Sequence, residues 1–110
     1  MSLTQKSFKE LSEMLEVIAH RFFAAKKMHL IAQQDTINEN DFDVSLPYDA
    51  YLLKVEEAYQ SLDEREKNLI NNEFFFQNYR YWWTSLYSKT SFYRFKRRAM
   101  LRFLEVFYYD

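Results

Sequence analysis

The chain has 110 residues and a formal net charge of −1, and 20% of its residues are aromatic. It contains neither cysteine nor glycine, which excludes a disulfide framework, a zinc finger, a P-loop and a G-x-G-x-x-G dinucleotide turn. The aromatic content excludes a disordered tail, and the length suits one domain. No run of about 18 apolar residues and no signal-peptide pattern occurs, so we expect a cytoplasmic protein without a membrane span. The expected fold class is all-α, a small helical bundle.

Residues 1–34 are predicted to form a long N-terminal amphipathic helix, beginning near Thr4. Its apolar side chains recur at steps of three and four: Phe8, Leu11, Leu15, Ile18, Phe22 and Ala25. The stripe is close to a heptad repeat. It therefore predicts either a face turned to the chain's own core or the seam of a homodimer.

Residues 35–47 break this pattern and are predicted to be a solvated acidic linker. Its carboxylates are Asp35, Glu39, Asp41 and Asp43. A calcium loop of the EF-hand type is excluded, because the stretch lacks the glycine and the closing glutamate that such a loop needs. Pro47 suits the first turn of the next helix, where its missing N–H costs nothing.

Residues 48–110 are predicted to be one helical domain. Its first helix has a short apolar stripe that includes Tyr51, Leu52, Val55 and Tyr59. Ser61 and Glu64 have the spacing of a capping box, which predicts the start of a second helix there. A short aromatic helix is then expected at about 79–86, with Trp82 and Trp83 as core residues.

The last helix is predicted to run from Lys89 to about Phe107, with Ser88 as its N-cap. Its apolar stripe is Phe92, Phe95, Ala99, Phe103 and Val106. A short helix, a tight turn and a longer helix make up the helix-turn-helix plan, which we place at about 79–107. The second helix of such a unit enters the major groove of DNA.

Charge is unevenly distributed along the chain. Residues 1–79 carry 8 Lys/Arg and 14 Asp/Glu, a balance of −6, whereas residues 80–110 carry 7 and 2, a balance of +5. Between Ser88 and Arg102 there are six basic residues and no acidic one. Such a run is often a solvated face, or pairs with acidic residues elsewhere, but here it lacks the i, i+4 partners of an ordinary solvated helix. It therefore favours binding to duplex DNA. The expected DNA-facing side chains are Lys89, Thr90, Tyr93, Arg94 and Arg97, with Arg98 on the same face.

No catalytic or metal-binding set is recognisable. The two histidines, His20 and His29, lie nine residues apart on one predicted helix, about 13 Å along its axis, which is too far for a shared metal ion. Glu16 and His20 are at i, i+4, a spacing more typical of a surface contact. The serines have no neighbouring base and no glycine-shaped elbow. We expect no enzyme activity, no cofactor and no metal.

Two segments carry a resemblance to a known family: LDEREKNLI (62–70) and WTSLYSKTSFYRFKRRA (83–99). Residues 62–104 resemble sigma-70 region-4-like helix-turn-helix domains, and more specifically the phage ArpU family of transcriptional regulators. The resemblance implies DNA binding in transcription control without catalysis. It adds Ser91 to the DNA-facing set. The N-terminal helix lies outside the resemblance, and we expect it to serve either in a homodimer or as a contact for RNA polymerase. The sequence departs from the plan at Tyr87, where many helix-turn-helix proteins have glycine.

Two other function classes compete with a regulator. The first is a helical module for protein–protein interaction or oligomerisation without nucleic-acid binding, which the long stripe and the aromatic excess favour. The second is binding of single-stranded nucleic acid by exposed aromatics and arginine, which is disfavoured because stacking platforms usually lie on sheets. The regulator hypothesis requires that the arginine-bearing side of the last helix faces solvent and is not paired with carboxylates.

Overall fold

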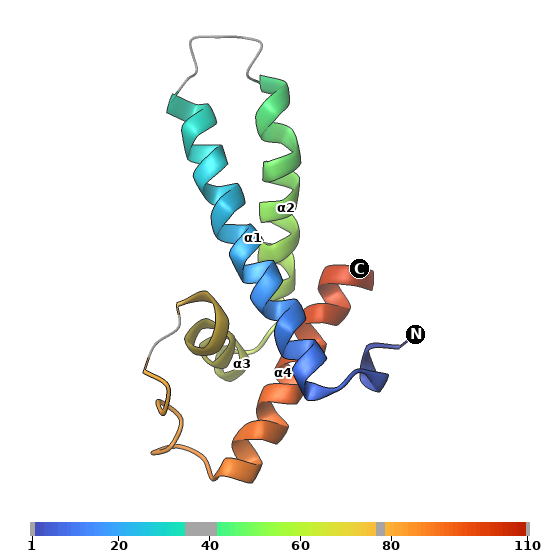
Figure 1. Cartoon of the computed structure of the whole chain (residues 1–110), viewed down its shortest axis with the longest axis vertical. Coiled ribbons are helices and arrows are strands. Elements are labelled where there is room, and N and C mark those ends of the chain that lie inside the picture. Colours follow the sequence, from blue (N-terminus) through green and yellow to red (C-terminus); the bar gives the residue numbers. More distant parts are fainter. Residues whose placement is uncertain (1, 35–41, 77–78, 110) are drawn as a thin grey trace.

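The computed structural model describes residues 2–34, 42–76 and 79–109 (Figure 1). Within these residues there is no strand, which confirms the all-α fold class. The elements are a 3₁₀ turn η1 (Leu3–Gln5), α1 (Phe8–Gln34), α2 (Phe42–Gln60), α3 (Glu64–Ile70), a π-helical turn η3 (Asn71–Phe75) and α4 (Lys89–Tyr109). None of the described helices combines the length and the apolar character that crossing a bilayer requires.

The N-terminal helix begins at Phe8 and not near Thr4, because Ser7 caps it. The Ser7 hydroxyl accepts a hydrogen bond from the Glu10 N–H at 3.1 Å, and the Glu10 carboxylate accepts one from the Ser7 N–H at 3.2 Å. These two bonds satisfy donors that a helix start otherwise leaves free. The backbone bond from Ser7 also lowers the pKa of Glu10.

Helices α1 and α2 run antiparallel and form a long hairpin, in which the C-terminal end of α1 and the N-terminal end of α2 project away from α3 and α4 (Figure 1). The predicted stripe of α1 faces the chain's own core: Leu11, Leu15, Ile18 and Ala25 are buried, and Phe8 and Phe22 are half-buried. The Tyr51 hydroxyl of α2 donates to the Ile18 carbonyl of α1 at 3.4 Å, and the His29 ring contacts the Asp49 carboxylate farther along the hairpin. The stripe thus forms the intrachain face that the sequence offered as one of two readings.

Helix α2 begins at Phe42, so the last six residues of the predicted linker are helical. The sequence placed the start of this helix at Pro47, but Pro47 is the sixth residue of α2, a position where proline removes one backbone hydrogen bond of the helix. These additional residues of α2 lie beside the C-terminal part of α1 (Figure 1). The rest of the linker, 35–41, lies outside the described residues.

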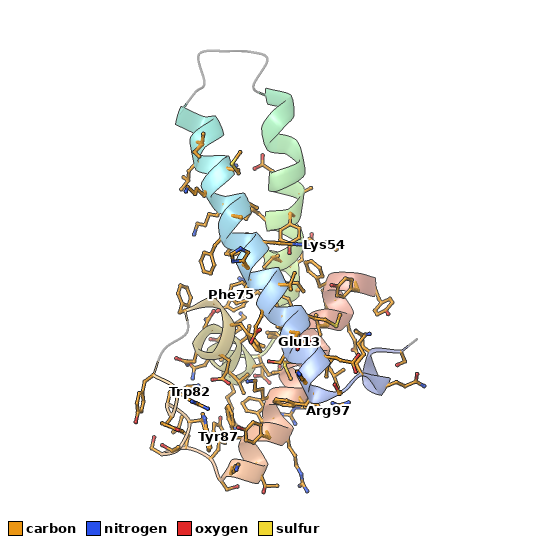
Figure 2. All side chains as sticks on the ribbon, in the orientation of Figure 1. Glu13, Lys54, Phe75, Trp82, Tyr87 and Arg97 are labelled. Atoms are coloured by element: carbon orange, nitrogen blue, oxygen red, sulfur yellow. The ribbon has the colours of Figure 1, made fainter. Side chains whose placement is uncertain are left out.

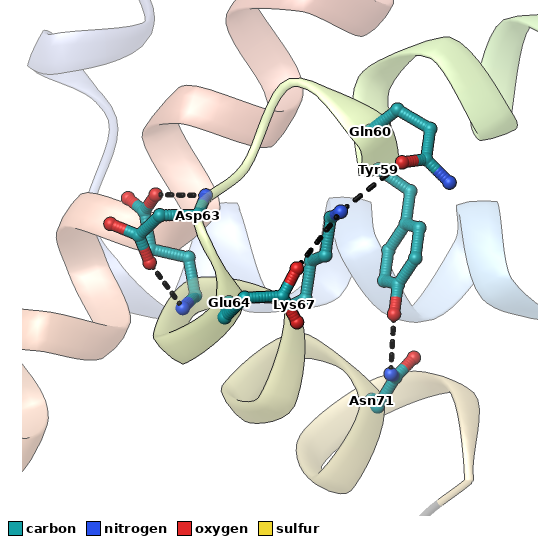
Figure 3. Close-up of polar contacts among 7 residues, drawn as sticks. Tyr59, Gln60, Asp63, Glu64, Lys67 and Asn71 are labelled. Carbon is teal, nitrogen blue, oxygen red and sulfur yellow. Dashed lines mark hydrogen bonds and ion pairs between the residues drawn. The ribbon is translucent and has the colours of Figure 1, made fainter.

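Helix α3 starts two residues later than its predicted capping box. Asp63 is the N-cap: its carboxylate accepts from the Glu66 N–H at 2.8 Å, and the Glu66 carboxylate accepts from the Asp63 N–H at 2.9 Å (Figure 3). Ser61 instead donates to the Ala58 carbonyl at 2.6 Å at the end of α2. Ser61 and Glu64 have the same spacing as Asp63 and Glu66, so the spacing alone does not distinguish the two pairs. Leu62, which lies in the link before the helix, is buried.

Two polar contacts hold α3 and η3 against the end of α2. The Lys67 ammonium donates to the Gln60 side chain at 3.1 Å and pairs with Glu64 at 3.5 Å, and the Asn71 amide donates to the Tyr59 hydroxyl at 2.7 Å (Figure 3). The link between α2 and α3 is therefore short and fixed.

The capping box of α3 predicts a pH dependence of stability. The Glu66 backbone N–H holds the pKa of Asp63 below its ordinary value of 3.8. A carboxyl group with a lowered folded pKa contributes stability above its unfolded pKa, and this stability is lost as the pH falls through the folded value. Asparagine caps without titrating, so Asp63→Asn should flatten the loss of thermal stability between about pH 5 and about pH 2, measured by circular dichroism. Identical pH profiles for the two proteins would contradict this assignment.

The predicted aromatic helix at 79–86 is wrong, because this segment forms consecutive turns. Its backbone bonds span three residues: Trp82 N–H to the Tyr79 carbonyl, Thr84 N–H to the Tyr81 carbonyl and Leu86 N–H to the Trp83 carbonyl. Short helices are marginal by themselves, and bulky aromatic residues favour them little. The helix-turn-helix therefore lacks its first helix at the predicted place.

Helix α4 begins at Lys89 as predicted, and Ser88 caps it by accepting from the Ser91 N–H at 3.2 Å. Its predicted stripe is buried except for the half-buried Val106. The buried face is wider than predicted and also includes Met100, Leu104 and Phe107. One core cluster draws side chains from η1, α1, α2, α3, η3 and α4.

Candidate nucleic-acid interface

Two cations of α4 form ion pairs with carboxylates of the acidic first part of the chain. The Lys96 ammonium lies 2.7 Å from Glu73 of η3, and both side chains are largely buried. The Arg102 guanidinium lies 3.2 Å from Glu66 of α3, whose side chain is fully buried. These pairs attach α4 to α3 and η3. They pair two of the six positive charges between Ser88 and Arg102 with carboxylates of the same chain: the Lys96 side chain is largely buried, whereas half of the Arg102 side chain stays exposed.

Arg97, one of the expected DNA-facing residues, is half-buried and holds the N-terminal segment. Its guanidinium donates to the carbonyl oxygens of Thr4 at 3.0 Å and Lys6 at 3.1 Å (Figure 2). Thr4 lies within η1, and Lys6 directly follows it in the link to α1. The arrangement fixes the start of α1 on α4 and gives Arg97 a structural role.

The remaining expected cations face solvent on the N-terminal half of α4. Lys89, Arg94 and Arg98 are exposed, and none of them forms an ion pair within the described residues. Arg94 and Arg98 are one turn apart on the outward side, and Thr90 is exposed one turn before Arg94. This end of α4 and the C-terminal end of α1 lie at opposite ends of the described structure (Figure 1).

Two further expected residues have local structural partners. Ser91 is exposed, and its hydroxyl accepts from the Ser88 hydroxyl at 3.0 Å within the cap. The Tyr93 ring meets Phe8 edge-on at 5.5 Å and Trp83 at 6.3 Å, and it remains 41% exposed. Tyr93 therefore joins the packing at the start of α1 and still borders the basic face.

Arg65 of α3 belongs to the same surface, although sequence reasoning did not assign it. Arg65 and Arg98 approach one ring: each guanidinium carbon lies 5.3 Å from the centroid of Phe95. The Arg65 guanidinium also donates to the Tyr87 hydroxyl at 3.1 Å, and this hydrogen bond raises the pKa of Arg65. In the sequence Arg65 stands in a run of alternating charges, so no local pattern marks it as part of a basic face.

The tryptophans predicted as core residues do pack against the core. The Trp83 ring stacks on Phe92 with centroids 4.4 Å apart, and Trp82 meets the same ring edge-on at 5.9 Å. The Trp82 indole N–H donates to the Glu73 carboxylate at 2.9 Å. These contacts hold the 79–86 turns beside the N-terminal part of α4, where Trp82 and Tyr87 are labelled in Figure 2.

A separate apolar groove lies between α1, α2 and η3. It has a volume of about 430 Å³. Its apolar lining includes Phe22, Phe23, Leu30, Leu52, Phe75 and Phe76. In the described parts of the chain no three His, Asp or Glu side chains are grouped so that they could hold a metal ion.

The chain matches no family model, no curated protein and no solved structure. The likeness of residues 62–104 to sigma-like regulators stays a hypothesis from the sequence. Function is therefore inferred from the exposed residues and their charges.

Proposed function

We propose that this protein binds duplex DNA through the outward face of the N-terminal half of α4, with Lys89, Thr90, Arg94 and Arg98 as the contacting residues. Arg65 of α3 adds a charge at the edge of this face. The observation that carries the proposal is that these cations are exposed and form no ion pair among the described residues. Phosphate neutralisation by such residues supplies most of the affinity of DNA-binding proteins.

Because residues 80–110 carry 7 Lys/Arg and only 2 Asp/Glu, a chain with a net charge of −1 can present a positive face. Glu66 and Glu73 pair with Arg102 and Lys96, on the part of α4 that packs on α3 and η3. The free cations all precede Arg102, toward the N-terminal end of the helix. The local charge of that face, not the net charge, determines attraction to a polyanion.

The role in the cell that we propose is transcription control in the cytoplasm, with RNA polymerase as a second partner. Its basis is the resemblance of residues 62–104, together with the Ser88 cap at the start of α4. The missing helix at 79–86 means that α4 is supported by α3 and by anchored turns. We expect it to contact DNA without the usual first helix lying across the backbone.

The test is a titration of fluorescent duplex DNA followed by anisotropy at several salt concentrations. Arg94→Glu/Arg98→Glu should weaken binding at least about a hundredfold at fixed salt, and each lost phosphate contact should lower the salt slope by about 1. The matched control is Lys26→Glu/Lys27→Glu, which makes the same charge change at exposed residues of α1. Equal losses in both variants would show that only net charge matters, and no binding by the wild type would refute the proposal.

The second candidate is an interaction module that docks a protein partner in the α1–α2–η3 groove. The observation in its favour is that Phe23, Leu30 and Phe76 line this groove and are at least 43% exposed. Exposed apolar patches of this kind often mark interfaces. Sedimentation of the free chain beside the DNA titration separates the candidates: a stable oligomer without duplex affinity would favour the module.

A further inference from the structure

The turns at 79–86 present two tyrosines to solvent from a fixed support. The exposed fractions are 72% for Tyr79 and 49% for Tyr81, and their ring centroids are 5.9 Å apart in an edge-to-face arrangement. The next two residues, Trp82 and Trp83, point the other way and pack on Phe92. Anchored turns thus hold the two exposed rings in place.

The surroundings of these rings carry positive charge. The Arg80 guanidinium carbon lies 5.7 Å from the centroid of Tyr81. No Asp or Glu occurs between Phe74 and Leu104, and the nearest acid before this stretch, Glu73, is engaged by Lys96 and Trp82. The turns at 79–86 are followed by Tyr87 and Ser88, and the exposed cations of α4 begin directly after them at Lys89.

Exposed aromatic rings together with cations suit an unpaired nucleic-acid strand. Each base offers a π-face for stacking, and its backbone offers a phosphate for an arginine. The positive charge of this acid-free stretch would attract a polyanion, but it would give a purely apolar partner no advantage. Such stacking platforms usually lie on a β-sheet. Here the contacts of Trp82 and Trp83 with Phe92 support the segment instead.

We infer that Tyr79 and Tyr81 stack on unpaired bases while Arg80 binds the adjoining phosphate. This inference rests on the proposed function, because α4 would hold the neighbouring duplex. The protein would then favour a junction between duplex and unpaired DNA, such as the edge of a melted bubble, over an uninterrupted duplex. Its ligand class is therefore partly melted DNA.

The test compares the affinities of the full chain for two probes of equal length, a blunt duplex and a duplex with a central unpaired bubble. We expect the wild type to bind the bubble about tenfold more tightly. Tyr79→Ala/Tyr81→Ala should abolish this preference and leave duplex affinity unchanged, whereas Tyr79→Phe/Tyr81→Phe should keep it. The matched control is Tyr108→Ala/Tyr109→Ala, which removes two exposed tyrosines from the opposite end of α4.

A second readout uses 2-aminopurine in the bubble, whose fluorescence falls when an aromatic ring stacks on it. Quenching by the wild type that is lost in the alanine variant supports the inference. A preference that survives in the alanine variant, or a wild type that binds both probes equally, overturns it while the duplex proposal stands. If the wild type binds neither probe, the proposed function fails as well.

Discussion

Phe92→Ala is expected to lower the free energy of unfolding by about 3–5 kcal/mol, the usual cost of deleting a buried phenylalanine ring. Phe92 is 1% exposed and stacks on Trp83 with the two ring planes 5° apart. Because small domains are stabilised by only about 5–15 kcal/mol, the variant would lose a large share of its stability. Urea unfolding followed by circular dichroism measures the change.

A second signal of the same experiment is tryptophan fluorescence. Both tryptophans contact Phe92, so the native variant should show a red-shifted emission as the 79–86 turns loosen. Tyr109→Ala is the control on the same helix, because its side chain is 69% exposed and should change stability by less than about 0.5 kcal/mol. A cost for Phe92→Ala as small as that of the control would show that the aromatic cluster does not hold the turns.

Helical periodicity predicted the core well in helices that bury one face over several turns. In α1 the spacing of Leu11, Leu15 and Ile18 identified the buried stripe, and in α4 the spacing of Phe92, Phe95 and Ala99 did so. Periodicity works there because the core requires an apolar side chain at each of these positions. It says nothing about which element covers the stripe.

Element starts were predicted less well, because they depend on choices between equivalent local signals. Ser61 and Asp63 each have a glutamate three residues later, and in the structure Asp63 is the N-cap while Leu62 is buried just before it. The segment 79–86 was misassigned for a related reason. Trp82 donates a hydrogen bond to Glu73 and Trp83 stacks on Phe92, and such contacts with residues outside the segment leave no mark in the local sequence.

The candidate site was only partly accessible from sequence. The positive run on α4 was visible, but the sequence did not show which cations are free. Carboxylates from α3 and η3 pair with Arg102 and Lys96, and backbone carbonyls accept hydrogen bonds from Arg97. Arg65, which belongs to α3, adds a further cation beside Phe95 of α4. Only the tertiary arrangement separates structural cations from exposed ones.

The buried ion pair between α3 and α4 leads to the second large expected effect. Arg102→Met should cost roughly 2–3 kcal/mol, because it leaves the carboxylate of Glu66 buried without its counter-charge. This is less than the full cost of breaking a buried pair, since half of the Arg102 side chain is exposed and water can reach the site. Methionine keeps most of the apolar stem, so the loss reports the charge.

The partner variant, Glu66→Gln, is expected to be much milder, within about 1 kcal/mol of the wild type. The amide oxygen can still accept hydrogen bonds from the Asp63 N–H and from the Arg102 guanidinium, half of whose side chain is already in contact with water. The amide nitrogen would take the place of Glu66 Oε2, a buried atom with no hydrogen-bond partner among the described residues. Removal of a buried charge therefore offsets the cost of an unsatisfied donor.

A double-mutant cycle decides whether charge or packing dominates at this contact. In the Glu66→Gln background, Arg102→Met should cost less than about 1 kcal/mol, giving a coupling energy of roughly 1–2 kcal/mol from urea unfolding near neutral pH. If Arg102→Met costs the same in both backgrounds, the arginine stabilises α4 through its stem alone. Coupling of the expected size would instead show that Glu66 holds Arg102 as a structural cation, in contrast to Arg94 and Arg98, which form no ion pair among the described residues and are the residues proposed to contact DNA.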